Sequence, residues 1–80
     1  MNAGQYDRII QRLEDAGAGA PSGRRFHACF GSGDSLRVFD IWDSREQFDA
    51  FGQTLIPILQ DIGVDMGEVQ DFPLHNEIVP

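Results

Sequence analysis

Positive charge is scarce in this chain of 80 residues. Lysine is missing altogether, and six arginines stand against thirteen aspartates and glutamates, which gives a formal net charge of −7 at pH 7. A protein with this balance repels a phosphate backbone rather than neutralising it. The composition therefore disfavours nucleic acid as a partner.

Cysteine and long apolar runs are also scarce. The single cysteine, Cys29, cannot form an internal disulfide, and no apolar run approaches the roughly 20 residues that a membrane-spanning helix needs. The opening residues, MNAGQYDRII, lack the basic region and apolar stretch that are typical of a signal peptide. We therefore expect a cytoplasmic protein without a membrane partner.

Recognised cofactor motifs are missing as well. The segment GSGD has neither the following helix nor the further glycines of a phosphate-binding or dinucleotide-binding loop. Two histidines and one cysteine match no standard metal-binding spacing. The sequence thus predicts no cofactor and no metal, and it disfavours phosphoryl and hydride transfer.

The remaining composition is that of a folded domain. The hydrophobic fraction is 41% and the charged fraction 24%, which is ordinary for a globular protein. A chain of this length forms one domain, residues 1–80, and buries only roughly 60–65% of the surface that its unfolded form exposes. A second subunit would therefore add stability.

Two amphipathic helices are predicted. An apolar stripe at i, i+3, i+4 and i+7 predicts a helix from about Ala3 to Asp15, which Gly17 can end. Ser44 begins a capping-box pattern ahead of a second stripe, which predicts a helix from about Arg45 to Asp61. Pro57 lies inside this second stripe, so we expect a kink or a break there.

Between the helices, residues 24–31 and 35–43 are predicted to form a β-hairpin around GSGD. In the expected register His27 faces Asp40, Cys29 faces Val38 and Arg25 faces Trp42, all on one side of the sheet. The other side carries Phe26, Ala28, Phe30, Phe39 and Ile41. Further on, the alternation in VQDFPLHNEIV predicts a half-buried strand, which Pro73 places at an edge.

The segments YDRIIQRL, FHACF, LRVFDIWDSREQFDAF and FPLHNEI resemble the dimeric α/β-barrel superfamily, which includes antibiotic-biosynthesis-type monooxygenases. The resemblance implies an α+β, ferredoxin-like fold of order αββαβ, that is βαββαβ without its first, central strand. It also implies an antiparallel sheet with two helices on one face, and two subunits that join their sheets around a cavity. The face with Phe26 and Phe39 would then bind the helices, and the face with His27 and Asp40 would line the cavity.

The pair His27 and Asp40 is the main candidate for chemistry. A histidine oriented by a carboxylate can act as a general base that removes a proton from an activated carbon or hydroxyl. The same pair can equally be a cross-strand hydrogen bond between two half-buried polar groups. The sequence leaves both interpretations open.

Five further residues are candidates for contact with a ligand. Trp42 can stack on an aromatic ligand or fill core volume, and Arg25 across from it can hold a ligand carboxylate. Cys29 is expected to be a small buried apolar side chain on the same face, and His75 is expected to point into the same cavity. Asn76 follows His75 near the end of the last strand, where the resembling proteins carry the same pair.

Three functions remain open at this point. The first is a homodimer that encloses a small apolar or aromatic ligand. The second is a cofactor-independent monooxygenase or isomerase with His27 and Asp40 as its base, and the third is a non-catalytic dimerisation module. Because the hairpin has apolar residues on both faces and two helices can cover only one, we expect a homodimer or a higher assembly.

Overall fold

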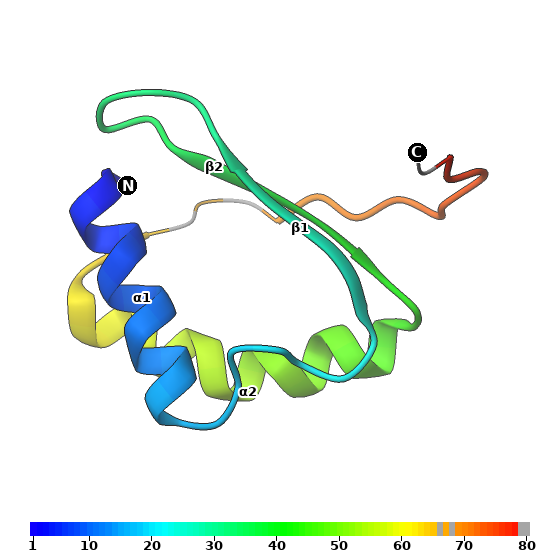
Figure 1. The fold of residues 1–80 in the computed structure, drawn as a ribbon, viewed down its shortest axis with the longest axis horizontal. Helices are drawn as coiled ribbons and strands as arrows, with labels where there is room; N and C mark the ends of the chain where they lie inside the picture. Colours follow the sequence, from blue (N-terminus) through cyan, green and yellow to red (C-terminus); the bar gives the residue numbers. More distant parts are fainter. Residues whose placement is uncertain (66, 68, 79–80) are drawn as a thin grey trace.

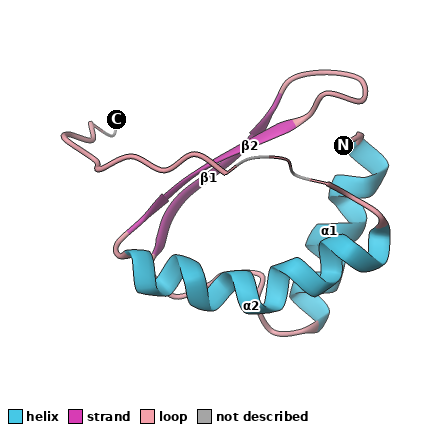
Figure 2. Cartoon of the chain, turned by 180° about the vertical axis from the view of Figure 1, so that it is seen from behind, coloured by secondary structure: helices cyan, strands magenta, loops and turns pink. Residues whose placement is uncertain are grey.

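The computed structural model describes residues 1–65, 67 and 69–78. In chain order it contains helix α1 (Ala3–Asp15), strands β1 (Arg24–Phe30) and β2 (Arg37–Trp42), and helix α2 (Arg45–Ile62). The two strands form an antiparallel sheet, and both helices lie on the same side of it (Figure 1). Figure 2 shows the same arrangement from behind. The predicted α+β class and the placement of both helices on one face are confirmed.

Helix α1 has the predicted bounds because both of its ends are specified locally. Asn2 caps the N-terminus: its side chain accepts a hydrogen bond from the Gln5 amide at 2.8 Å, and the Gln5 side chain accepts one from the Asn2 amide at 2.9 Å. At the other end Gly17 adopts a φ of +75°, which glycine reaches without steric cost.

Helix α2 is continuous from Arg45 to Ile62, so the predicted break at Pro57 is wrong. Ser44 caps its N-terminus, and Gly63 ends it with a left-handed φ of +83°. Proline removes only one bond of the helical ladder, here the bond to the carbonyl of Gln53, an exposed residue. Ile58, directly after the proline, is buried in the core and anchors the last turns.

The hairpin register is confirmed over most of its length, with His27 opposite Asp40 and Cys29 opposite Val38. At the open end the prediction is wrong, because Trp42 pairs with Arg24 instead of Arg25. Arg25 is the extra residue of a β-bulge, and its exposed guanidinium pairs with Asp43 at 3.5 Å and with Glu77 at 2.9 Å.

The two faces of the sheet are exchanged relative to the prediction. The helices cover the face that carries His27, Asp40 and Trp42, where Trp42 packs against the buried core of Ile9, Leu13, Phe51 and Ile58. The face with His27 and Asp40 was predicted to line a cavity because both side chains are polar. The two side chains form a hydrogen bond with each other, so burying them against the helices costs little free energy. The prediction that this face lines a cavity between two subunits is therefore wrong for this fold.

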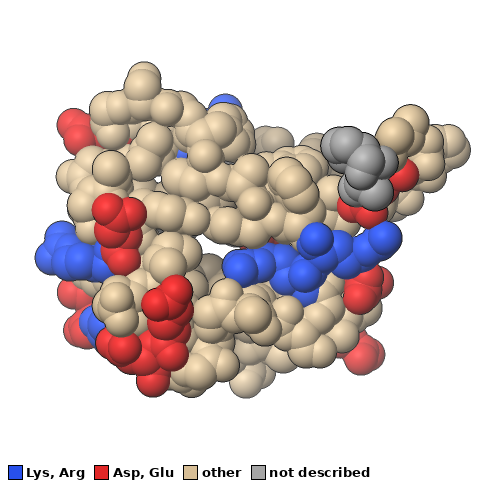
Figure 3. Space-filling model, viewed as in Figure 1, with Lys and Arg blue, Asp and Glu red and all other residues tan. Residues whose placement is uncertain are grey.

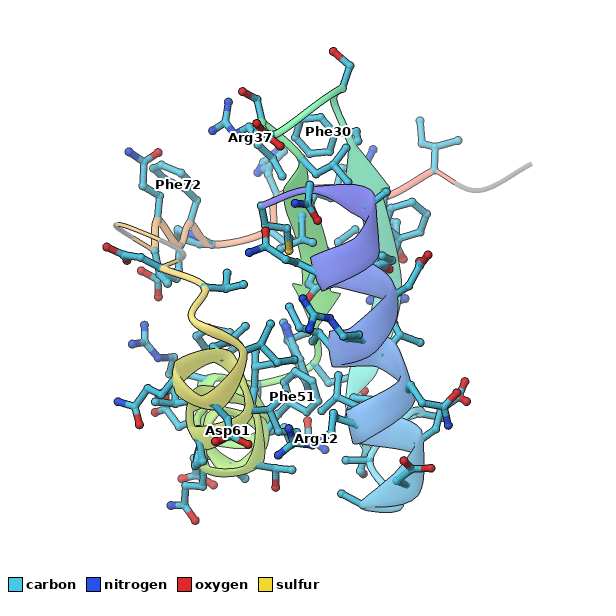
Figure 4. All side chains as sticks on the ribbon, turned by 90° about the vertical axis from the view of Figure 1, so that its left-hand side faces the viewer. Arg12, Phe30, Arg37, Phe51, Asp61 and Phe72 are labelled. Atoms are coloured by element: carbon cyan, nitrogen blue, oxygen red, sulfur yellow. The ribbon has the colours of Figure 1, made fainter. Side chains whose placement is uncertain are left out.

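The opposite face of the sheet, called the outer face below, points away from the helices. It carries Phe26, Ala28 and Phe30 from β1, and Arg37, Phe39 and Ile41 from β2. Its three phenylalanines are 48%, 49% and 53% exposed, in the order Phe26, Phe30 and Phe39. In Figure 4, Phe30 and Arg37 lie together at the turn end of the hairpin, far from Phe51 in the core.

The predicted last strand is not formed by residues 71–78, and residue 79 of the same stretch lies outside the described part of the chain. Phe72, Leu74 and Ile78 are 80%, 50% and 87% exposed, and Figure 4 shows Phe72 standing away from the core. The described contacts of this segment with the rest of the chain include the ion pairs Arg45–Asp71 and Arg25–Glu77. The apolar alternation is present, but residues 69–78 pair with neither β1 nor β2, although each strand of the two-stranded sheet has one unpaired edge.

None of the described helices has the length and apolar character that crossing a bilayer requires.

Candidate functional site

Three polar side chains form a hydrogen-bonded row between α1 and the hairpin. The hydroxyl of Tyr6 lies 2.7 Å from Nε2 of His27, and Nδ1 of His27 lies 2.5 Å from Oδ1 of Asp40. The row thus takes one member from α1, one from β1 and one from β2. The side chains of His27 and Asp40 are 23% and 18% exposed.

The row follows from the local structure of each element. Tyr6 lies on the apolar stripe of α1, one turn before the buried Ile9 and two turns before the buried Leu13. The antiparallel register sets His27 directly against Asp40. The rings of Tyr6 and His27 are parallel to within 4°, with centroids 6.0 Å apart, so the phenol meets the edge of the imidazole in nearly one plane.

Burial fixes the protonation of Tyr6. The pKa of its phenol is raised above the ordinary value of 10.0, mainly by burial and further by the charges of Cys29, Asp40 and Asp7, while Arg24 acts in the opposite direction. At neutral pH the hydroxyl therefore keeps its proton and can donate it to Nε2 of His27. In that arrangement Nδ1–H donates to Asp40, and both ring nitrogens of His27 are satisfied.

The row forms one wall of a pocket between the hairpin and the two helices. The other lining residues are Arg24 and the apolar side chains of Met1, Ile9, Ile10, Leu13, Val38, Phe51, Leu55 and Leu59. The free volume is about 50 Å3. This is room for one or two waters of roughly 30 Å3 each, against roughly 300–1,000 Å3 for established ligand sites. A ligand must therefore displace side chains to enter.

A larger hollow lies elsewhere, between α1 and the end of α2. It measures about 300 Å3 and is lined by Arg8, Gln11, Arg12, Asp61 and Ile62. It is open, and Arg12 and Asp61 of its lining form an ion pair at 2.9 Å, as the facing side chains in Figure 4 show. Because it holds no candidate catalytic group, we do not place the site there.

Trp42 has the packing role that was one of its two predicted alternatives. Its ring lies 5.7 Å from that of Phe48 and 5.3 Å from that of Phe51, between centroids, and it does not line the pocket. Its Nε1–H is buried without a hydrogen-bond partner among the described residues. Cys29 has a free thiol and is half-buried rather than buried as predicted, and it does not line the pocket either.

Three predicted ligand contacts lie away from the row. Arg25 is on the bulge with its two carboxylate partners. His75 and Asn76 are exposed in the C-terminal segment, and neither lines the pocket around His27. The expectation that His75 points into the same cavity is wrong, because the segment does not form the strand that would have aimed it there.

Sequence reasoning missed two residues of the pocket, Tyr6 and Arg24. Tyr6 was counted only as part of the apolar stripe of α1. Its hydroxyl could have indicated a polar contact, because a buried phenol usually finds a hydrogen-bond partner. Arg24 had no such signal. It reaches the pocket face only because the bulge at Arg25 changes the alternation of β1.

Within residues 1–65, 67 and 69–78, no three His, Cys, Asp or Glu side chains come together as a metal site would require. Comparisons with family models, with curated proteins and with solved structures gave no match. The fold and the site together define a small α+β domain with a half-buried Tyr-His-Asp row. The resemblance to dimeric α/β barrels stays a prediction.

Proposed function

We propose that this chain binds a small, largely apolar or aromatic molecule in the pocket between the hairpin and the helices, with a polar end of the ligand at Nε2 of His27. The observation that carries the proposal is the half-buried row of Tyr6, His27 and Asp40 at one wall of an otherwise mostly apolar pocket. Apolar walls with a few convergent polar groups are the usual composition of small-molecule sites.

Tyr6 sets the shape of the ligand that fits. Its phenol now holds the position on Nε2 that a ligand hydroxyl would take, and the pocket has no spare volume for both. A ligand therefore enters by displacing the Tyr6 ring and takes over its hydrogen bond. Asp40 keeps the imidazole oriented throughout, because its bond to Nδ1 does not involve the ligand. An aromatic ligand with a hydroxyl replaces the displaced group most closely.

The test compares the two histidines of the chain. A panel of phenols and quinones is screened for compounds that raise the denaturation midpoint of the native protein. A compound that binds as proposed loses its effect in His27→Ala and keeps it in His75→Ala, because His75 is exposed and away from the pocket. The proposal is wrong if no compound shifts the midpoint, or if His27→Ala responds like the native protein.

A second candidate function is proton abstraction by His27. It is favoured by the 2.5 Å contact with Asp40, which orients the ring and stabilises a proton taken up at Nε2. In an isomerase His27 takes a proton from one substrate carbon and returns it to another. In a monooxygenase the deprotonated carbon reacts with O2 as the oxidant, a CH2 becomes C=O, and the second oxygen atom leaves as water. Full turnover in both His27→Ala and Asp40→Asn, on a substrate identified by the screen, would exclude this function.

The proposal includes a homodimer formed through the outer face. The buried apolar core of the described chain is four residues, which is small for a domain of 80 residues. The outer face contributes five apolar residues and Arg37 but no carboxylate, although the chain as a whole has a net charge of −7. Two copies therefore repel each other least through this face, and they bury its three phenylalanines when it pairs with itself.

Sedimentation equilibrium tests the dimer. The expected species has twice the chain mass of 8.9 kDa, and Phe39→Asp shifts it toward the monomer. Ile56→Asp is the matched control, because Ile56 is 54% exposed against 53% for Phe39 but lies on α2, away from the outer face. A native protein that stays monomeric at micromolar concentration contradicts the dimer, as does equal dissociation in the two variants.

A further inference from the structure

Arg24 is a half-buried arginine that lines the pocket between the hairpin and the helices. Arg12, Arg25 and Arg45 each pair with at least one carboxylate, whereas no such pair involves Arg24 among the described residues. Among the described residues, its guanidinium donates a hydrogen bond from Nη2 to the carbonyl of Gly19 at 3.2 Å. A guanidinium has five N–H donors, so most of the donors of Arg24 remain available.

The position of Arg24 is fixed from two sides. The bulge pairs it with Trp42 and turns it toward the pocket, which it lines together with Tyr6 and His27. Its guanidinium lies 5.6 Å from the ring centroid of Phe51, one of the four buried core residues. The residue is half-buried as a result. Figure 3 shows arginine side chains in a band between the hairpin and α2, at the level of the pocket.

Arg8, Arg24 and Arg37 have no carboxylate partner among the described residues, and of these three only Arg24 is half-buried. We infer that Arg24 is the anion-binding end of the pocket and that the natural ligand is an aromatic or other largely apolar molecule with a carboxylate. Arginine holds a carboxylate through two parallel hydrogen bonds, and partial burial strengthens them. The ligand then spans the pocket from its carboxylate at Arg24 to its hydroxyl or other polar group at His27. This inference rests on the pocket proposed above.

The test uses two probes of the same shape and different charge, 4-hydroxyphenylacetate and 4-hydroxyphenylacetamide. Binding is measured by the fluorescence of Trp42, the single tryptophan, whose ring contacts Phe51 of the pocket lining. The native protein is expected to bind the acid about tenfold or more tightly than the amide, the factor typical of a hydrogen bond to a charged group.

Three variants test whether Arg24 causes the preference for the acid over the amide. Arg24→Gln is expected to lose the preference and to bind the acid and the amide about equally. Arg24→Lys keeps the positive charge but lacks the two parallel donors of a guanidinium, so it should retain a reduced preference for the acid. It replaces Arg24→Gln in the test if that variant does not fold. Arg37→Gln is the matched control: its guanidinium lies 5.8 Å from the ring centroid of Phe30, also without a carboxylate partner among the described residues, but on the outer face. It should keep the full preference.

The outcomes separate this inference from the pocket proposal. If the acid and the amide bind the native protein equally, or if Arg24→Gln keeps the preference, the role of Arg24 is wrong while the pocket stands. If neither probe binds, both proposals are wrong. A preference lost equally in Arg24→Gln and Arg37→Gln would reflect the overall charge of the chain, and it too overturns the inference.

Discussion

The Tyr6 hydroxyl and Nε2 of His27, 2.7 Å apart, join helix α1 to strand β1 across 21 positions of the chain. Tyr6 is the single tyrosine of the protein, so its ionisation can be followed without interference from another phenol. Two properties meet in this contact: the phenol is partly buried, and it occupies the edge of the histidine that a ligand would need. The contact therefore links the stability of the fold to the state of the pocket.

Alkaline titration should show the burial of Tyr6 directly. Its pKa is raised in the folded state, chiefly by burial, so the folded protein holds the phenol proton more tightly than the unfolded chain does. The resulting stabilisation is fully present below the unfolded pKa, which is about 10, and is lost as the pH rises through the higher folded value. Phenolate absorbance in the native protein should rise at higher pH than in urea-unfolded protein.

Tyr6→Phe is the control for this prediction. The variant lacks the titrating phenol, so its free energy of unfolding should fall less steeply over the same alkaline range. At neutral pH it should be less stable by about 1 kcal/mol, the usual value of one hydrogen bond. Identical titration of folded and unfolded native protein would contradict the burial of the phenol.

The His27–Asp40 contact should show strong energetic coupling. In a double-mutant cycle of His27→Ala and Asp40→Ala, we expect a coupling energy of about 1–3 kcal/mol, because each single change leaves a half-buried polar group without its partner. The cycle of Arg12→Ala and Asp61→Ala is the comparison, since these side chains are 45% and 66% exposed. Exposed ion pairs couple by about 0.2–1 kcal/mol. Urea denaturation measures both, and equal coupling would refute the prediction.

Two isoleucines on either side of Pro57 give a matched test of the core. Ile58 is 6% exposed and Ile56 is 54% exposed, on the same helix. Ile58→Ala should lower the free energy of unfolding by about 2–5 kcal/mol, because it opens a cavity beside Phe51 and Leu13. Ile56→Ala should cost less than about 1 kcal/mol. Similar losses for both variants would mean that α2 packs with a different face.

Two glycines of the hairpin turn should differ in their tolerance of a side chain. Both have positive φ, +106° at Gly31 and +60° at Gly33. A Cβ at Gly31 would lie 2.7 Å from the carbonyl oxygen of Ser35, whereas a Cβ at Gly33 meets nothing within 4 Å. Gly33→Ala should therefore cost about 1–2 kcal/mol and Gly31→Ala clearly more. Thermal unfolding of the two variants measures both costs. A larger loss of stability in Gly33→Ala than in Gly31→Ala would contradict the turn geometry.

The sequence predicted what depends on neighbouring residues. The first helix was predicted from its apolar stripe and Gly17, the second from the capping pattern at Ser44 and its own stripe, and the pairing of His27 with Asp40 from the turn length. It did not predict which face of the hairpin the helices cover. Apolar residues occupy both faces, so the choice depends on how Trp42 fits against Phe48 and Phe51, a contact between separate elements.

The candidate site was also predicted only in part. The central pair was found because cross-strand partners are set by register. Tyr6 joins it through packing of α1 on the hairpin, and Arg24 through a bulge, neither of which leaves a periodic pattern in the sequence. His75 was placed wrongly because the alternating pattern of its segment was taken to imply pairing with the sheet, and residues 69–78 do not form that pairing.

The bulge also determines where the hairpin tolerates a change in length. Loss of a residue elsewhere in β1 would turn every side chain between that position and the strand end to the opposite face. Residue 25 is the exception, since without it Arg24 would directly precede Phe26, in regular pairing with Trp42 and Ile41. The row of Tyr6, His27 and Asp40 would be untouched, at the cost of the ion pairs of Arg25 with Asp43 and Glu77. Natural length variation in this hairpin should therefore be concentrated at that single position.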